Sequence, residues 1–221
     1  MTKKLRLAFV TIGQSPRDDI VPEMLADIGG DVEAHQFGAL DELPENDIRA
    51  LVPGPGETSF ATRLRDGREI TISKERVEIR LEELLERVDQ QGFDAVVLLC
   101  TGTHVKPLSR TLMIESQRVV DSMVESLASS SQRLGVILPL ERQVEEFPKR
   151  HVFSRTAKLI AASPYAGDNI AEKAAALAEC DLVIMHCMGY SEAMRAAARQ
   201  AISAPVLLSR RIVSGAVRQI I

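Results

Sequence analysis

Two short segments of this chain share a pattern that contains a thiol. The first reads FDAVVLLCTG from Phe93 to Gly102, and the second reads CDLVIMHCMG from Cys180 to Gly189. In each, an apolar run separates an Asp from a Cys, and a Gly stands two residues after the Cys. A duplicated unit would present Cys100 and Cys187 at equivalent places. Because the thiolate is the form that accepts a proton or attacks, two such thiols could act as an acid/base pair on one carbon.

The other candidate residues follow from where these thiols stand. In an open parallel sheet, ligands bind beyond the carboxyl ends of the strands. Backbone N–H groups after each Cys could stabilise a thiolate. The N–H groups of the Thr101-Gly102 and Met188-Gly189 turns could stabilise an enolate. The alternative is a structural role, in which a strand-terminal Cys is a small core residue. We predict Cys100 and Cys187 as catalytic residues, and the following as substrate-binding residues: Gln14, Ser15, Thr101, Gly102, Thr103, Met188, Gly189 and Tyr190.

Other reactive side chains give weaker signals. Cys180 matches Phe93 at a strand entrance, so we predict a structural role for it. His104 could orient a substrate group, whereas His186 precedes Cys187 in a strand and points to the opposite face. His186, His35 and His151 are predicted to be core residues. Three arginines, Arg17, Arg210 and Arg211, could bind a carboxylate or lie solvated at the surface.

Cofactor and metal sites lack their usual sequence signals. Cys100, His104 and Cys187 have the residue types that bind zinc, but not the clustered spacing of a metal site. No GxGxxG follows the first strand, no phosphate loop follows Gly54-Pro55-Gly56, and no GxSxG is present. The sequence therefore predicts neither a metal nor a cofactor.

Composition narrows the class of protein. The chain has 221 residues, of which 45% are apolar and 26% charged, with a net charge of −4. There is no basic block and aromatic content is 4%, so nucleic acid is not the expected partner. No apolar run approaches the length of a membrane helix. The three cysteines are an odd number, typical of reduced thiols in a cytoplasmic protein.

Strand and helix patterns alternate along the chain, which predicts an α/β fold with mostly parallel sheets. Ser15-Pro16 reads as the N-cap and first position of a helix. The first half is about 40 residues longer than the second, and we predict that a Pro/Gly loop and a hairpin at Asp66-Gly67 form the insertion. The expected strands are 5–11, 32–37, 61–64 and 69–72 of the hairpin, 94–100, 134–138, 151–153, 181–187 and 205–209. The expected helices are 17–28, 41–51, 74–90, 141–149, 168–179, 191–200 and 211–221.

Five motifs resemble the AroM family over essentially the full length of the chain. They are Thr11-Ile-Gly-Gln-Ser-Pro16, Ser73-Lys-Glu-Arg-Val-Glu78, Gln91-Gly-Phe-Asp94, Cys187-Met-Gly-Tyr190 and Ala204-Pro-Val-Leu-Leu-Ser209.

More distantly, the two Cys segments resemble the aspartate/glutamate/hydantoin racemase superfamily. Cys100-Thr101-Gly102-Thr103-His104 is similar to the Cys-Asn-Thr-Ala-His of aspartate racemases, and Cys187-Met188-Gly189 to the Cys-Ala-Gly of hydantoin racemases. Gly13-Gln14-Ser15 departs from their Asp-Ser-Gly turn. The resemblance implies two flavodoxin-like lobes related by a pseudo-twofold, with the active site between them. Residues 1–105 and 206–221 would form the first lobe and residues 106–205 the second.

The resemblance also implies a cofactor-independent reaction, in which one thiolate removes an α-proton and the other thiol returns it. Three interpretations follow. The first is a racemase or isomerase of a small carboxylate that uses both thiols. The second is a non-catalytic module that binds a small metabolite anion. The third is a lyase, hydrolase or isomerase that uses Cys187 alone, as one-cysteine members of the superfamily do. A homodimer is possible in each case.

Overall fold

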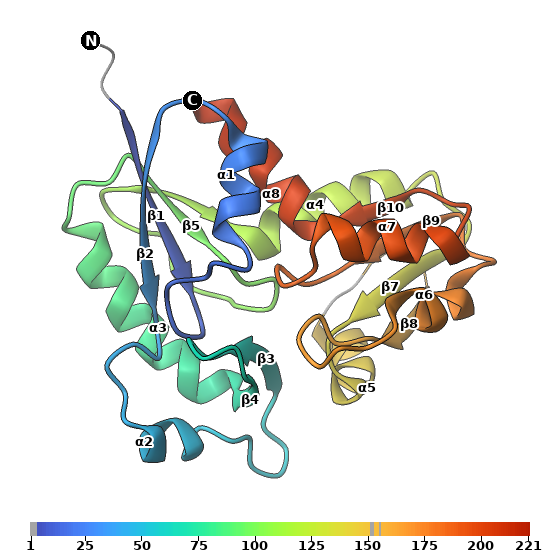
Figure 1. Cartoon of the computed structure of the whole chain (residues 1–221), viewed down its shortest axis with the longest axis horizontal. Helices are drawn as coiled ribbons and strands as arrows, with labels where there is room; N and C mark the ends of the chain where they lie inside the picture. The colour runs from blue at the N-terminus through green and yellow to red at the C-terminus, as the bar shows by residue number, and fades with distance from the viewer. Residues whose placement is uncertain (1–3, 151–152, 155) are drawn as a thin grey trace. The chain divides into compact units, whose positions relative to one another are not determined.

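The computed structural model describes residues 4–150, 153–154 and 156–221. Figure 1 shows an α/β protein whose chain forms two compact units, residues 1–117 with 214–221, and residues 118–213. The boundaries expected from the resemblance are 1–105 with 206–221, and 106–205. The units differ from these because the strand 112–115 pairs in the first sheet and the strand 206–208 pairs in the second.

The first unit is built around a four-stranded parallel sheet in the order β2-β1-β5-β6. Its central strands are buried on both faces, which explains their continuous apolar runs. The elements of this unit are β1 (Leu5–Thr11), α1 (Val21–Ile28), β2 (Val32–Gly38), α2 (Glu45–Arg49), β3 (Ser59–Arg63), β4 (Glu69–Ser73), α3 (Lys74–Asp89), β5 (Ala95–Leu98) and β6 (Leu112–Glu115).

The predicted hairpin is present and belongs to the longer first half. Strands β3 and β4 pair antiparallel, and Gly67 in their turn has a φ of 91°, a conformation that favours glycine. In Figure 1 the hairpin and α2 lie beyond the carboxyl ends of β1 and β2. The inserted segment therefore stands at the edge of the sheet where ligands bind in open parallel sheets.

The second unit repeats the design with a sheet in the order β10-β9-β7-β8, again parallel throughout. Its elements, including the helix that leads into it and the one that leads out, are α4 (Ser116–Ala128), β7 (Leu134–Leu138), α5 (Glu141–Arg150), β8 (Ala157–Ala161), α6 (Ile170–Ala174), η1 (Ala175–Leu177), β9 (Leu182–Met185), α7 (Glu192–Ala201), β10 (Val206–Leu208) and α8 (Ser209–Val217). The last element, η2 (Arg218–Ile220), follows α8 and belongs to the first unit.

The two sheets correspond strand by strand. In each, the first strand has the second on one side and the third on the other, and the fourth lies beside the third. β5 pairs with β1 at Leu98 and Val10, and β9 pairs with β7 at Met185 and Ile137. Cys100 and Cys187 each follow two residues after the end of the third strand, so the duplication predicted from the sequence is confirmed.

Several local predictions are wrong. Ser15-Pro16 does not begin a helix: α1 begins at Val21, and the Ser15-Pro16 peptide bond is cis in the preceding loop. Asn169 rather than Asp168 caps α6, accepting a hydrogen bond from the Glu172 N–H. The strand beside β7 spans 157–161; of the predicted strand 151–153, residues 151 and 152 lie outside the described residues. Strand β6 and helix α4 were not predicted.

Candidate active site

Cys100 lies at the carboxyl end of β5 and is mostly enclosed. Its N–H donates to the Leu98 carbonyl at 2.9 Å, which turns the chain out of the strand. The residue is 8% exposed and belongs to an apolar cluster that includes Phe60, Leu64 and Val105. The structure therefore places this predicted catalytic residue at the expected edge of the sheet, with only a small part of its surface open to solvent.

Cys187 lies at the equivalent place after β9 and is more open. It is intermediate in burial, at the margin of the apolar cluster of the second unit. The Gly189 N–H donates to the Cys187 Sγ at 3.4 Å, and the Tyr190 N–H donates to the Cys187 carbonyl at 3.4 Å. A backbone N–H directed at the sulfur is an arrangement that favours a thiolate.

The glycine two residues after each Cys is packed against an aromatic ring. A Cβ at Gly102 would lie 2.5 Å from Cε1 of Phe60. A Cβ at Gly189 would overlap the hydroxyl of Tyr165 and lie 2.5 Å from its Cζ. Both turns therefore need glycine because a ring covers them, although the two rings come from unrelated segments.

One face of the inserted hairpin covers two strand ends in the first unit. Phe60 and Thr62 are two residues apart on β3, so they share a face. Phe60 contacts Gly102 after β5, and Thr62 contacts Gly13 after β1. The Gln14 N–H also donates to the Arg63 carbonyl at 3.3 Å. The hairpin is thus a cover over the loops that carry the predicted site residues.

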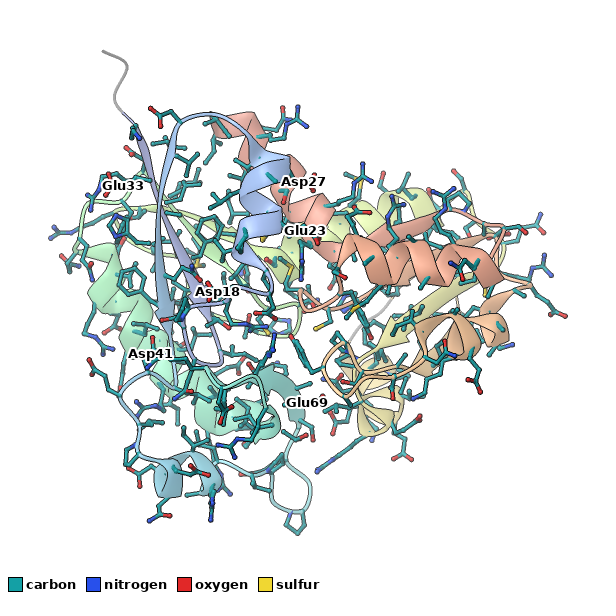
Figure 2. All side chains as sticks on the ribbon, in the orientation of Figure 1. Asp18, Glu23, Asp27, Glu33, Asp41 and Glu69 are labelled. Atoms are coloured by element: carbon teal, nitrogen blue, oxygen red, sulfur yellow. The ribbon has the colours of Figure 1, made fainter. Side chains whose placement is uncertain are left out.

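Gln14 and Ser15 have structural partners in this loop. The side-chain oxygen of Gln14 accepts from the Arg65 N–H at 2.9 Å. The Ser15 N–H and Oγ donate to the carboxylate of Asp41 at 2.9 and 2.6 Å, and Figure 2 labels Asp41 in the loop after β2. Arg65 in turn donates to the Ser15 carbonyl at 2.7 Å.

The remaining predicted substrate-binding residues differ in exposure. Thr101 is intermediate in burial, whereas Thr103 and Met188 are buried. Thr103 Oγ1 is buried and has no hydrogen-bond partner among the described residues. Tyr190 is fully buried, and its hydroxyl donates to the Ala162 carbonyl at 2.7 Å. Tyr190 is therefore a fixed core residue of the second unit.

All three candidate arginines have protein partners, and two of them are buried. Arg17 is buried and donates to the Asp19 carboxylate through Nε and Nη2, both at 2.8 Å. Arg210 is 1% exposed and donates to the carbonyls of Met188 and Gly189. Arg211 is exposed and pairs with Glu192 at 3.3 Å.

A titratable cluster beside the Cys100 turn was missed in the sequence. The His104 N–H donates to Glu78 at 2.8 Å, and His104 Nδ1 lies 3.2 Å from Lys74 Nζ. A lysine ammonium can only donate, so this contact makes Nδ1 the acceptor and leaves the ring proton on Nε2. Burial raises the pKa of Glu78, against the opposing effects of the His104 N–H and the Lys74 charge. The i,i+4 spacing of Lys74 and Glu78 at the start of α3 was the available signal.

Cys180 and His186 lie as expected. Cys180 is buried against Gly135, and burial raises the pKa of its thiol. His186 is buried, with its Nε2 2.9 Å from the Asp121 carboxylate and the ring of Phe147 edge-on at 5.1 Å. Both have structural surroundings.

His35, predicted to be a core residue, is only half-buried because β2 is an edge strand, and its Nε2 lies 2.6 Å from the Glu33 carboxylate. His151 lies outside the described residues. Within the described residues, no group of three or more His, Cys, Asp or Glu side chains is arranged to hold a metal ion, and no helix could cross a membrane.

Comparison with solved structures identifies similar folds at low sequence identity. The maleate isomerase Iso from Pseudomonas putida S16 superposes with a TM-score of 0.59 at 11% identity, covering 99% of this chain and 93% of the isomerase. Unliganded arylmalonate decarboxylase superposes with a TM-score of 0.56 at 12% identity, covering 98% of this chain and 92% of the decarboxylase. Allantoin racemase from Klebsiella pneumoniae superposes with a TM-score of 0.53 at 15% identity, covering 98% of this chain and 87% of the racemase.

Sequence comparison gives a family. No curated protein matches the chain significantly. The family model described as AroM protein matches residues 7–221, nearly the whole chain. With the duplicated α/β unit and the thiol at the end of each third strand, this match shows that the chain belongs to the AroM family.

Proposed function

We propose that this chain is a cofactor-independent, isomerase-like enzyme that acts on a small carboxylate through cysteine thiols. The observation that carries the proposal is the environment of Cys187. A partly exposed thiol stands at the carboxyl end of β9, and the Gly189 N–H is directed at its sulfur. The duplicated fold supplies a second thiol, Cys100, at the same position of the other sheet.

Proteins of similar fold support this class of reaction. They include a maleate cis–trans isomerase from Nocardia farcinica, solved with a covalently bound succinylcysteine intermediate, and an aspartate racemase from Picrophilus torridus. Both names describe reactions at a carbon of a small carboxylate. By likeness of fold, the substrate class proposed here is a small carboxylate or a related anion.

The proposed reaction is a proton exchange at carbon. The Cys187 thiolate takes the proton from the carbon beside the carboxylate, and the electron pair moves into the carboxylate to form an enolate. The Cys100 thiol then returns a proton to that carbon and becomes the thiolate. N–H groups at the Met188-Gly189 and Thr101-Gly102 turns would stabilise the enolate charge. No atom is gained or lost, so no co-reactant is needed.

A second candidate is an enzyme that uses Cys187 alone. The observation that favours it is the burial of Cys100, which is 8% exposed in an apolar cluster closed by Phe60. In that case Cys187 would protonate or add to the substrate, and Cys100 would be part of the core.

The two candidates are separated by solvent-deuterium exchange. The wild type is incubated in D₂O with maleate, aspartate, allantoin and an arylmalonate, and deuterium at carbon is followed by NMR. Inversion or isomerisation of the product is followed alongside exchange. Under the two-thiol proposal Cys187→Ser and Cys100→Ser each abolish inversion or isomerisation, while Cys180→Ser, at the third thiol, leaves it intact. Under the one-thiol candidate only Cys187→Ser abolishes it. Full exchange in Cys187→Ser would contradict both.

We also propose a cytoplasmic location for this activity. All three cysteines are reduced thiols in the structure, and thiols stay reduced in a reducing compartment. The reaction proposed above requires them in that state.

A further inference from the structure

Arg210 is a buried cation directly behind the turn that follows Cys187. It is the second residue of α8 and is 1% exposed. Its Nε and Nη2 donate to the Met188 carbonyl at 3.2 and 3.1 Å, and Nη2 also donates to the Gly189 carbonyl at 3.2 Å. Burying a guanidinium is costly unless it is hydrogen-bonded, and here the partners include two carbonyls of this turn.

The peptide group between Met188 and Gly189 connects this cation to the thiol. Its carbonyl accepts from Arg210, and its N–H donates to Cys187 Sγ at 3.4 Å. A trans peptide is planar and directs its C=O and N–H to opposite sides. With the carbonyl held by a guanidinium, the N–H is therefore fixed toward the sulfur. The positive charge also polarises the peptide in the sense that strengthens an N–H to sulfur contact.

The first unit lacks this charge at the corresponding place. Glu115 of β6 pairs with Leu98, and Leu208 of β10 pairs with Met185. Cys100 and Cys187 lie two residues after the paired positions of the third strands. Gln117 and Arg210 lie two residues after the paired positions of the fourth strands, and each is the second residue of the next helix. Both are buried, but Gln117 is neutral.

We infer that Arg210 is a positioning residue that orients the Met188-Gly189 peptide toward Cys187 and thereby makes Cys187, rather than Cys100, the thiolate of the pair. The inference deepens the proposed function, in which Cys187 takes the first proton. It assigns direction to the chemistry: the copy backed by a cation holds the base, and the copy backed by a neutral amide holds the acid.

The test measures thiol reactivity, which needs no substrate. Native protein is alkylated with iodoacetamide between pH 5 and pH 10, and modification at each cysteine is quantified by peptide mass spectrometry. Arg210→Met keeps a long apolar side chain without the charge. We expect its pH midpoint for Cys187 to rise by about one unit, with about tenfold slower alkylation below the midpoint. Arg210→Lys keeps a charge and should recover part of this loss.

Two controls distinguish positioning from packing. Gln117→Met makes the matched change in the first unit and should leave the Cys187 profile unchanged. Cys180 alkylation reports general loosening and should stay slow in every variant. A Cys187 profile in Arg210→Met equal to that of the wild type would overturn the inference. Faster alkylation of Cys180 in Arg210→Met would also overturn it, because the substitution would then have loosened the packing.

A second measurement uses the wild type alone and so does not depend on a variant folding. The amide proton of Gly189, followed by NMR during a pH titration, should shift with the same midpoint as Cys187 alkylation, because it is the donor to that sulfur. A Gly189 amide that does not titrate would overturn the inference. If no carboxylate is turned over but Arg210 still controls Cys187 reactivity, the proposed function fails and this inference stands.

Discussion

Replacing Gly102 with alanine tests how tightly the inserted hairpin closes over the Cys100 turn. The added Cβ would lie 2.5 Å from Cε1 and 3.1 Å from Cζ of Phe60. Carbon atoms in ordinary contact lie about 3.5–4.0 Å apart, so the ring must retreat by roughly 1 Å. Phe60 is 3% exposed and packed in the core of the first unit, and that core must move with it.

The magnitude follows from the cost of overpacking. Extra methyl groups in a filled core cost about 1–3 kcal/mol, and with a displacement of this size we expect about 2 kcal/mol less free energy of unfolding for Gly102→Ala. With an m-value of about 2 kcal/mol/M, the urea midpoint should fall by about 1 M. The control is Gly215→Ala in α8, where no atom lies within 4 Å of the added Cβ, so no loss of stability is expected.

Urea unfolding of the double variant identifies Phe60 as the cause. Leucine lacks the Cε1 and Cζ atoms, so Gly102→Ala should cost less than about 1 kcal/mol in a Phe60→Leu background. A Gly102→Ala variant as stable as the wild type would show that Phe60 does not close tightly over the turn. A cost that is the same with and without the Phe60 ring would show that another contact is responsible.

Three further predictions concern other parts of the structure. The pKa of Glu78 is raised by burial, so this carboxyl adds stability below its ordinary pKa that is lost as the pH rises through the raised one. Glu78→Gln should therefore unfold at higher urea than the wild type at pH 7, with the difference vanishing below about pH 4; an equal difference at both pH values would contradict this. Gly189→Ala should cost about 1–3 kcal/mol by urea unfolding, because the Cβ lies 2.5 Å from Cζ of Tyr165; a neutral effect would count against the described packing. Ser191→Ala should cost about 1 kcal/mol and Ser191→Asp much less, since Ser191 caps α7 through the Met194 N–H; equal losses would mean that the cap contributes nothing.

The duplicated architecture could be predicted because its signal is local. Each repeated segment carries its own apolar strand, and both fold as the third strand of a parallel sheet. Helix α3 was equally readable, since Ser73 caps it and its buried residues recur at helical spacing. Helix α4 also has a sequence signal of helical spacing, because Val120, Val124 and Ala128 recur at four-residue intervals and are fully buried. Strand β6 had little signal, because it has four residues and begins with an exposed Leu112.

The site was less predictable because its decisive contacts are distant in sequence. Ser15 resembles a helix cap, but its hydroxyl donates to Asp41 in another loop. Arg210 resembles a carboxylate ligand, but its guanidinium is held by carbonyls 21 and 22 residues away. In both cases the side chain has the expected chemistry, and the tertiary fold supplies a protein partner that composition and spacing do not reveal.

Site-resolved alkylation of the wild type measures which of the three thiols is reactive. Iodoacetamide is applied to the native protein at several pH values, and modification is measured separately at Cys187, Cys100 and Cys180. We expect Cys187 to react first, with a midpoint below the ordinary thiol value of about 8.5, and Cys180 to react last. Cys187 reacting no faster than Cys180 would contradict the assignment of Cys187 as the reactive thiol.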